Sequence, residues 1–385
     1  MDFRFVLILL LLLALLGYVG WHLWMLPPAA AWLRWLLVVA EVVGVGLAVL
    51  ALTPLEDRLP MPLASFVYNV GNKALIVVFY LFMLFLLADL LRLVHVLPTS
   101  WVRDNWWSCV AVATAMAVLF VYAHLHYEHK QRVELTVDTD GRVERPLKVV
   151  ALSDLHLGYH NHRTDLERWV AMVNAEKPDF IVIAGDLIDR SLRPLLEDDM
   201  AAALRSFDAP VYASLGNHEY YAGYYDHPAD VERFFADAGI VLLRDSVVVF
   251  GNIVVIGRDD RSNPRRRSLG RLMEVVESQS RKVAETTDST TSRLHDFTTP
   301  FTILLDHQPY HLEESEQAGI GLQVSGHTHR GQVWPLSWIT DALYECSWGT
   351  LQKGTTRYYV SSGMGIWGAK YRIGTQSEYV VINLI

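Results

Sequence analysis

Four long apolar runs dominate the first third of the chain and limit what it can fold into. They cover roughly Phe5–Leu26, Trp32–Leu52, Ala74–Leu91 and Trp106–Tyr127. Each has about the 20 residues that a helix needs to cross a bilayer, and tryptophans gather near the run ends, as at a membrane interface. A cleaved signal peptide would explain the first run only. We expect residues 1–127 to form a transmembrane region of four helices, with two or three crossings as the alternative.

The segments between the runs carry turn signals, among them Pro27-Pro28, the stretch 53–72 with its three prolines, and 98–105. Four crossings would place both ends of the region on one side, and the distribution of Lys and Arg favours the cytoplasmic side. We therefore expect an integral protein of a bacterial inner membrane, with the following domain in the cytoplasm. Asp89 is interpreted as an ion-pair partner of Arg92, the alternative being a functional intramembrane acid.

Residues 128–385 hold most of the charge and are typical of a globular domain of mixed type. The net charge of −9 argues against a nucleic-acid partner. The two cysteines, Cys109 and Cys346, lie in different parts of the chain and are not expected to pair. They provide neither a disulfide framework nor a cysteine-rich zinc site.

The pattern of the second part alternates strands and helices. The stretch 133–153 predicts a hairpin turning at Asp140-Gly141, followed by the strand Leu147–Ser153. Helical spacing predicts helices over 164–176, 194–207 and 231–238. Further strands are expected at 179–185, 210–215, 301–306 and 319–325, with paired strands over 240–256 and three closing strands at 332–335, 357–363 and 378–385.

Polar side chains end five of these strands. They are Asp154 and His156, Asp186, Asn217 and His218, His307, and His327 and His329. Because sites in sheet-based α/β domains gather at the carboxyl ends of strands, we expect these side chains to meet. Imidazole, carboxylate and amide ligands without a thiolate suit Mn, Fe, Zn or Co. Seven or more ligands are too many for one ion, whereas two bridged ions fit the count and serve displacement at phosphorus.

The blocks DLH, GDLID, GNHE, a lone histidine and GHTH stand in an order that resembles the calcineurin-like metallophosphoesterase superfamily over about 147–385. LGNHEYYAG, ILLDHQP, GHTHRGQVWP and YYVSSGMG are similar to its membrane-associated branch of YkuE- and YaeI-type phosphodiesterases. The resemblance implies a domain over 128–385 in which two mixed β-sheets pack face to face with helices outside. It also implies two divalent transition-metal ions, with manganese favoured.

The resemblance also implies roles for individual residues. Asp154, His156 and His329 would hold the first ion, Asn217, His307 and His327 the second, and Asp186 would bridge them. His218 would contact the scissile phosphate and protonate the leaving oxygen. Asp189 and Glu219 would orient ligand imidazoles or backbone from behind. Arg330 stands where this branch commonly has glycine, and would contact substrate phosphate or face solvent.

Two classes of function follow. The first is a membrane-anchored phosphoesterase that hydrolyses a phosphodiester or pyrophosphate, with a lipid-linked substrate presented at the bilayer. A UDP-2,3-diacylglucosamine pyrophosphatase-like hydrolase of lipid A synthesis is one form of it. The second is a non-catalytic membrane receptor or transporter with a pseudoenzyme domain. The complete ligand set favours the enzyme.

Residues 258–300 form a polar and basic insertion in the second part. It carries Arg265, Arg266 and Arg267, an amphipathic stretch around 269–276 and a Ser/Thr-rich tail. One interpretation is a solvated insertion. The other is a lid or membrane-surface element, because a basic amphipathic helix favours anionic lipid.

Overall fold

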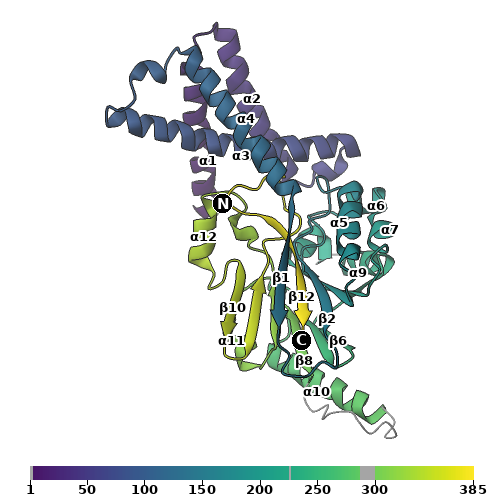
Figure 1. Cartoon of the computed structure of the whole chain (residues 1–385). Helices are drawn as coiled ribbons and strands as arrows, with labels where there is room; N and C mark the ends of the chain where they lie inside the picture. The colour runs from purple at the N-terminus through teal and green to yellow at the C-terminus, as the bar shows by residue number, and fades with distance from the viewer. Residues whose placement is uncertain (1–2, 225–226, 287–299) are drawn as a thin grey trace. The chain divides into compact units, whose positions relative to one another are not determined.

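The computed structural model of the chain describes residues 3–224, 227–286 and 300–385 (Figure 1). It divides into two compact units. The first comprises Met1–Leu125 with Gly368–Lys370, and the second comprises His126–Trp367 with Tyr371–Ile385.

The N-terminal helices are α1 (Phe3–Met25), α2 (Ala31–Ala51), α3 (Met61–Leu93) and α4 (Trp106–Glu128). By length and composition, α2, α3 and α4 can each cross a membrane. The apolar part of α1 within the segments searched is the shorter stretch Leu10–Met25. Three candidate spans are therefore established, and the fourth crossing stays a prediction.

The expected break over 53–72 is wrong in its second half, because α3 already begins at Met61. Pro60 is the residue before the helix and Pro62 lies in its first turn. A proline is tolerated there, since the first amide groups of a helix have no intrahelical acceptor. The prolines start a helix here instead of interrupting one.

Asp89 of α3 joins a polar cluster between α1 and α3. Its carboxylate accepts a hydrogen bond from the Tyr18 hydroxyl at 2.8 Å and lies 3.1 Å from His22 Nε2. The guanidinium of Arg92 lies 3.5 Å away. The expected ion pair between Asp89 and Arg92 is therefore present. Tyr18 and His22 of α1 are further partners of the Asp89 carboxylate.

Two mixed six-stranded sheets form the second unit. The first has the order β1-β12-β2-β3-β4-β5. Its strands are β1 (Lys130–Val137), β12 (Ser377–Leu384), β2 (Leu147–Leu152), β3 (Phe180–Ala184), β4 (Val211–Ser214) and β5 (Ile240–Leu242). The second has the order β10-β11-β9-β8-β7-β6. Its strands are β10 (Gly349–Lys353), β11 (Thr356–Val360), β9 (Leu322–Ser325), β8 (Phe301–Leu305), β7 (Ile253–Gly257) and β6 (Ser246–Phe250). The predicted pair of mixed sheets is confirmed.

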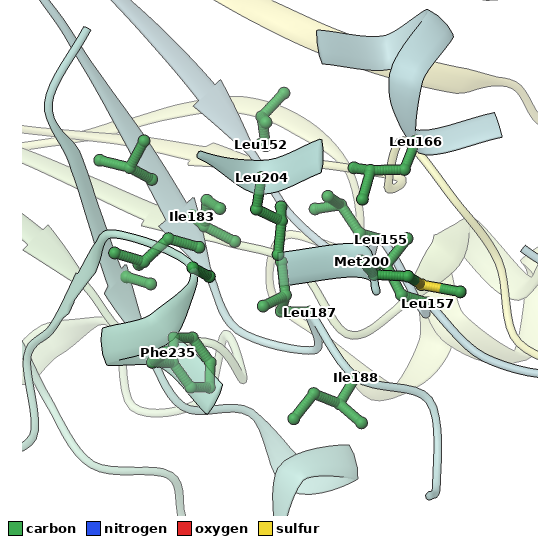
Figure 2. Close-up of a cluster of buried hydrophobic side chains, with 14 of the residues drawn as sticks. Leu152, Leu155, Leu157, Leu166, Ile183, Leu187, Ile188, Met200, Leu204 and Phe235 are labelled. Carbon is green, nitrogen blue, oxygen red and sulfur yellow. The ribbon is translucent and has the colours of Figure 1, made fainter. Parts of the chain in front are cut away.

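Alternating side chains of each strand build separate layers of core, because successive residues of a strand point to opposite faces. Val149 and Ala151 of β2 face the second sheet, where they share a cluster with Ile303 of β8. Val150 and Leu152 face the helices α5 (Arg163–Ala175), α7 (Met200–Leu204) and α9 (Pro228–Asp237). Figure 2 shows Leu152 in this helix-side cluster with Leu204 and Phe235. The outer helices thus fix β2, β3 and β4 in place.

The expected hairpin at Asp140-Gly141 does not form a strand pair. β1 and β2 are separated by β12, which pairs parallel with β1 and antiparallel with β2. Local pattern could not show that a strand from the far end of the sequence lies between these two. The stretch 332–335 is also not a strand; Val333 makes only an isolated bridge to Ile373.

The amphipathic stretch 269–276 lies in α10 (Leu269–Thr286), whose apolar face is already used by the fold. Leu269, Leu272 and Val276 are buried against Val254 and Leu304 on the outer face of the second sheet. This packing rules out a free membrane-surface role for these apolar residues. The Ser/Thr-rich tail falls largely in 287–299, outside the described residues.

We expect Leu272→Ala to destabilise the second unit by about 2–5 kcal/mol, because it leaves a cavity between α10 and the sheet. Arg271→Gln is the matched control, since Arg271 is exposed and forms an ion pair with the exposed Glu274. The midpoint of thermal unfolding should fall for the first variant and stay nearly unchanged for the second. Equal midpoints for wild type and Leu272→Ala would contradict the packing of α10.

Candidate metal centre

The side chains expected to form a site all follow strands of the second unit. Those after β2, β3 and β4 come from neighbouring parallel strands of the first sheet. Those after β8 and β9 come from neighbouring parallel strands of the second sheet. The two sheets therefore bring carboxyl ends together, and the structure gathers the predicted ligands into two groups.

The first group consists of Asp154, His156 and His329, all buried. The Nε2 atoms of the two histidines lie 3.1 Å apart. Asp154 Oδ1 lies 3.4 Å from Nε2 of His329 and 3.8 Å from Nε2 of His156. Three potential donor atoms thus surround one point.

The second group consists of Asp186, His307 and His327. Asp186 Oδ2 lies 3.0 Å from Nε2 of His307. Asn217 belongs beside this group, because its Oδ1 lies 2.8 Å from Nδ1 of His327. Asp186 Oδ2 is also 3.7 Å from Nε2 of His156 in the first group. This carboxylate therefore lies between the two groups, in a position suited to a bridging ligand.

The donor set fits metal ions. Bonds of about 2.1 Å to one ion place neighbouring ligand atoms about 3 Å apart, which is the spacing of the pairs within each group. Nδ1 of His307 lies 2.7 Å from the Ala184 carbonyl oxygen, which can only accept a hydrogen bond. Nδ1 therefore carries the proton. Nε2 of His307 is buried and lies 3.0 Å from Asp186 Oδ2, so these two atoms can share one ion.

The charges in the site also call for cations. Burial alone would raise the pKa of Asp186, but the charge on His307 outweighs it and lowers the pKa well below its usual value. Burial lowers the pKa of His327 to about 4, with a further contribution from the charge on His307, and burial lowers that of His329 well below its usual value. Ionised carboxylates thus stand beside the neutral imidazoles of His327 and His329. The charge on Asp186 outweighs burial and raises the pKa of His307 well above its usual value. The buried carboxylates therefore call for positive charge, which protons or metal ions can supply.

Strained backbone holds these groups. Five of the candidate ligands adopt left-handed backbone conformations, namely Asp154, His156, Asp186, His327 and His329. Such conformations are uncommon for residues with a Cβ and cost on the order of 1–2 kcal/mol each. Strain of this kind clusters at functional sites, where the surrounding structure enforces it.

The glycines of the motifs are needed because carboxylates pass close to them. A Cβ on Gly216 would lie 2.1 Å from Asp186 Oδ1, and one on Gly326 would lie 2.2 Å from Asp154 Oδ2. Any larger residue at either position would displace a candidate ligand. The glycine before Asn217 and the glycine before His327 are therefore part of the site's geometry.

His218 is more exposed than His156 and His307. Its side chain keeps 16% of its surface accessible, whereas His156 and His307 are fully buried. Its Nδ1 donates a hydrogen bond to the Asp189 carbonyl. Its ring packs edge-on against His156, with the ring centroids 4.4 Å apart. Nε2 is thus left as the atom that can exchange a proton with a bound molecule.

Asp189 and Glu219 lie behind the candidate ligands. Asp189 Oδ1 is 3.2 Å from Nδ1 of His156, which fixes Nε2 of that ring as the donor atom toward the first group. Burial alone would lower the pKa of His156, but hydrogen bonds to Asp154 and Asp189 outweigh burial and raise it to about 10.

Glu219 contacts backbone instead of imidazoles. It accepts hydrogen bonds from the amides of Gly216, Asp186 and Ile188, which ties the loops after β3 and β4 together. Burial, then the charge on Asp186, raises the pKa of Glu219 to about 7.

Arg330 is placed by an aromatic neighbour. Its guanidinium lies over the Trp348 ring, 4.1 Å from the centroid. A cation–π contact of this kind still leaves N–H groups available. The predicted contact of Arg330 with substrate therefore stays a prediction.

Arg372 is a residue that sequence reasoning missed. It is fully buried and donates to the carbonyl oxygens of His329, Ser362 and Gly365. Burial lowers its pKa to about 10, so it still carries its charge at neutral pH. It fastens the loop after β11 to the backbone of a candidate ligand. A lone arginine before the last strand gives no local signal of this role.

The fold and this site together define a metallophosphoesterase domain. Residues 147–331 match the family model described as calcineurin-like phosphoesterase. An uncharacterized metallophosphoesterase of Campylobacter jejuni is 31% identical over 273 residues, which cover 70% of this chain and 67% of that protein. The chain belongs to the calcineurin-like phosphoesterase family, a class of metal-dependent phosphoester hydrolases.

Two further relatives are a protein named as transmembrane and a YkuE protein. A zebrafish protein named transmembrane protein with metallophosphoesterase domain is 32% identical over 288 residues, which cover 70% of this chain and 60% of that protein. The uncharacterized metallophosphoesterase YkuE of Bacillus subtilis is 28% identical over 276 residues, which cover 68% of this chain and 89% of that protein. The chain thus spans about three fifths of the zebrafish protein and two thirds of the Campylobacter one.

We expect Asp186→Asn to lower metal content at both groups, because Asp186 lies between them, and His329→Ala to affect mainly the first. Elemental analysis after loading with Mn²⁺ measures this directly, with two ions expected for the unaltered chain. A single ion at saturating Mn²⁺, or two ions retained by Asp186→Asn, would contradict the arrangement.

Proposed function

We propose that this chain is a membrane-anchored phosphoesterase that uses two divalent metal ions to hydrolyse a phosphodiester or pyrophosphate. The observation that carries the proposal is the pair of donor groups around Asp186, at the carboxyl ends of strands from both sheets. The first ion would be held by Asp154, His156 and His329. The second would be held by Asn217, His307 and His327, with Asp186 shared.

Divalent ions at these positions would supply Lewis-acid stabilisation at phosphorus and a lowered pKa for a bound water. Mn, Fe, Zn and Co all suit imidazole and carboxylate donors, and we favour manganese. The chain's own groups hold the donors in orientation. Asp189 fixes His156, the Ala184 carbonyl fixes His307, and Arg372 fixes the backbone at His329.

His218 is proposed as the general acid. Its Nδ1 proton is held by the Asp189 carbonyl, so a second proton on Nε2 would be the one delivered to the leaving oxygen. Its partial exposure lets Nε2 reach a bound substrate.

We expect His218→Asn to retain metal but to lose about 10²–10⁴ in kcat, the usual contribution of general acid–base catalysis. An ester with a nitrophenolate leaving group needs less protonation and should lose less than an alkyl ester. Steady-state rates on both, with metal content measured in parallel, provide the test. Equal losses on the two esters would argue against the general-acid role.

The apolar helices support a substrate at the bilayer. We propose that four crossings anchor the domain, that it faces the cytoplasm of a bacterial cell, and that its substrate is lipid-linked. A UDP-2,3-diacylglucosamine pyrophosphatase-like activity is one form of this proposal. The alternative, a receptor or transporter with an inactive domain, is disfavoured by the completeness of the donor set.

A soluble nitrophenyl phosphodiester assayed with added Mn²⁺ tests the class of function. We expect hydrolysis that a chelator abolishes and Mn²⁺ restores, because the proposed Lewis-acid chemistry needs divalent ions at both donor groups. Incubation with a bacterial lipid extract, followed by mass spectrometry, should then show loss of a phosphorylated lipid. Full activity in excess chelator would contradict the metal-dependent mechanism. Hydrolysis of soluble esters with an unchanged lipid profile would contradict only the proposal of a lipid-linked substrate.

A further inference from the structure

A concave site of the second unit is lined in part by the segment that follows His218. It is a cavity of about 590 Å³ whose wall includes Tyr220, Tyr224, Arg244, Arg265 and Arg267. Its volume falls within the roughly 300–1,000 Å³ typical of small-molecule sites. Three arginines line it, and Asp245 is the one carboxylate among its lining residues. The cavity therefore has the charge of an anion-binding site.

Arg244 is held in place at one edge of its guanidinium. Its Nε donates to Asp259 at 2.9 Å, and its Cζ lies 5.1 Å from the centre of the Tyr224 ring. The fully buried Asp259 also accepts from the Tyr220 hydroxyl and from Asn263. Within the described segments, the terminal Nη atoms of Arg244 make no hydrogen bond, so a fixed fork of donors remains for a ligand.

The other two arginines have little to compensate their charge. The Arg267 guanidinium donates to the backbone carbonyl of Asp245 at 3.3 Å. The Arg265 side chain has no hydrogen-bond or ion-pair partner among residues 3–224, 227–286 and 300–385. The carboxylates of Asp245, in the wall, and Asp259, paired with Arg244, oppose the charges of the three lining arginines. One positive charge is thus left in excess at the cavity.

Arg266, by contrast, does not line the cavity. Its guanidinium forms an ion pair with the buried Asp306 at 3.0 Å, and Arg258 pairs with the same carboxylate. The run of three arginines is therefore divided in the fold, with one holding the core and two facing the cavity. Arg266 thus has a structural role, whereas Arg265 and Arg267 are available to a ligand.

The cavity is joined to the metal centre through neighbouring residues on two sides. Tyr220 in its wall follows two residues after His218, and the adjacent Tyr221 ring lies 5.1 Å from the His218 ring. On the other side, Asp260, which follows Asp259, accepts from Gln308 at 2.9 and 3.0 Å, next to His307. Short segments of chain therefore link the wall of the cavity to His218 and to His307.

From this arrangement we infer that the cavity binds a second, non-scissile phosphate group of the substrate. This inference rests on the proposed phosphoesterase function and narrows its substrate to esters whose alcohol carries a further phosphate. Arginine forks suit phosphate oxygens because two parallel hydrogen bonds form at once.

The kinetic test uses two soluble nitrophenyl phosphodiesters, one of glycerol and one of glycerol 3-phosphate. The phosphorylated ester should show a KM lower by roughly 10-fold or more, the usual effect of one hydrogen bond between charged groups. Arg265→Gln should remove most of this preference, and Arg265→Lys should restore part of it. Arg271→Gln, an exposed arginine of α10, is the matched control and should keep the preference.

A binding measurement separates this inference from the proposed function. Isothermal titration of inorganic phosphate into the chelator-treated full chain should show binding that Arg265→Gln weakens and Arg271→Gln does not. Phosphate binding without any hydrolysis would leave the cavity as an anion site and reject the enzyme. Hydrolysis with equal KM for both esters would overturn the substrate subsite, whether or not free phosphate binds.

Discussion

The carboxylate of Asp186 is the point on which the domain's arrangement depends. It follows β3 of the first sheet, lies 3.7 Å from His156 of the same sheet and 3.0 Å from His307 of the second. A buried charge is costly unless it is paired and hydrogen-bonded. The Asp186 carboxylate therefore needs its partners from both sheets, His156 and His307, at the same time. The sandwich, the three amides held by Glu219 and the close approach of Gly216 all serve this placement. Two donor groups around one acid are what link this fold to chemistry at phosphorus.

Much of this could be predicted from the sequence, because ligand types and strand ends are local features. The strands that carry Asp154, Asp186, Asn217 and His327 were recognisable from apolar runs ending in glycine and polar residues. Pairing between distant strands was not. Nothing near Asp140 shows that β12 enters between β1 and β2. The buried Arg372 and the left-handed backbone of the candidate ligands likewise depend on tertiary contacts.

The insertion shows that a sequence pattern can predict a helix without predicting what the helix packs against. The amphipathic stretch in 269–276 is helical, yet its apolar face covers the second sheet and leaves little for a membrane. The arginine run looks uniform in sequence, but Arg266 pairs with Asp306, which lies in a different segment of the chain. Helix amphipathicity predicts that a face is buried; it does not predict against what. The partners that decide each arginine's role are separated from it in sequence.

The place of β12 has a consequence for the order in which the domain assembles. β12 follows every other strand of the two sheets in sequence, yet it is an interior strand of the first sheet. Until it enters, β1 and β2 present unpaired edges, which are templates for aggregation, and such long-range pairing is slow to form. Arg372, which fastens the backbone at His329, comes shortly before this strand. The same late segment therefore closes the sheet and secures the candidate metal centre, so that a chain arrested before this point would lack both.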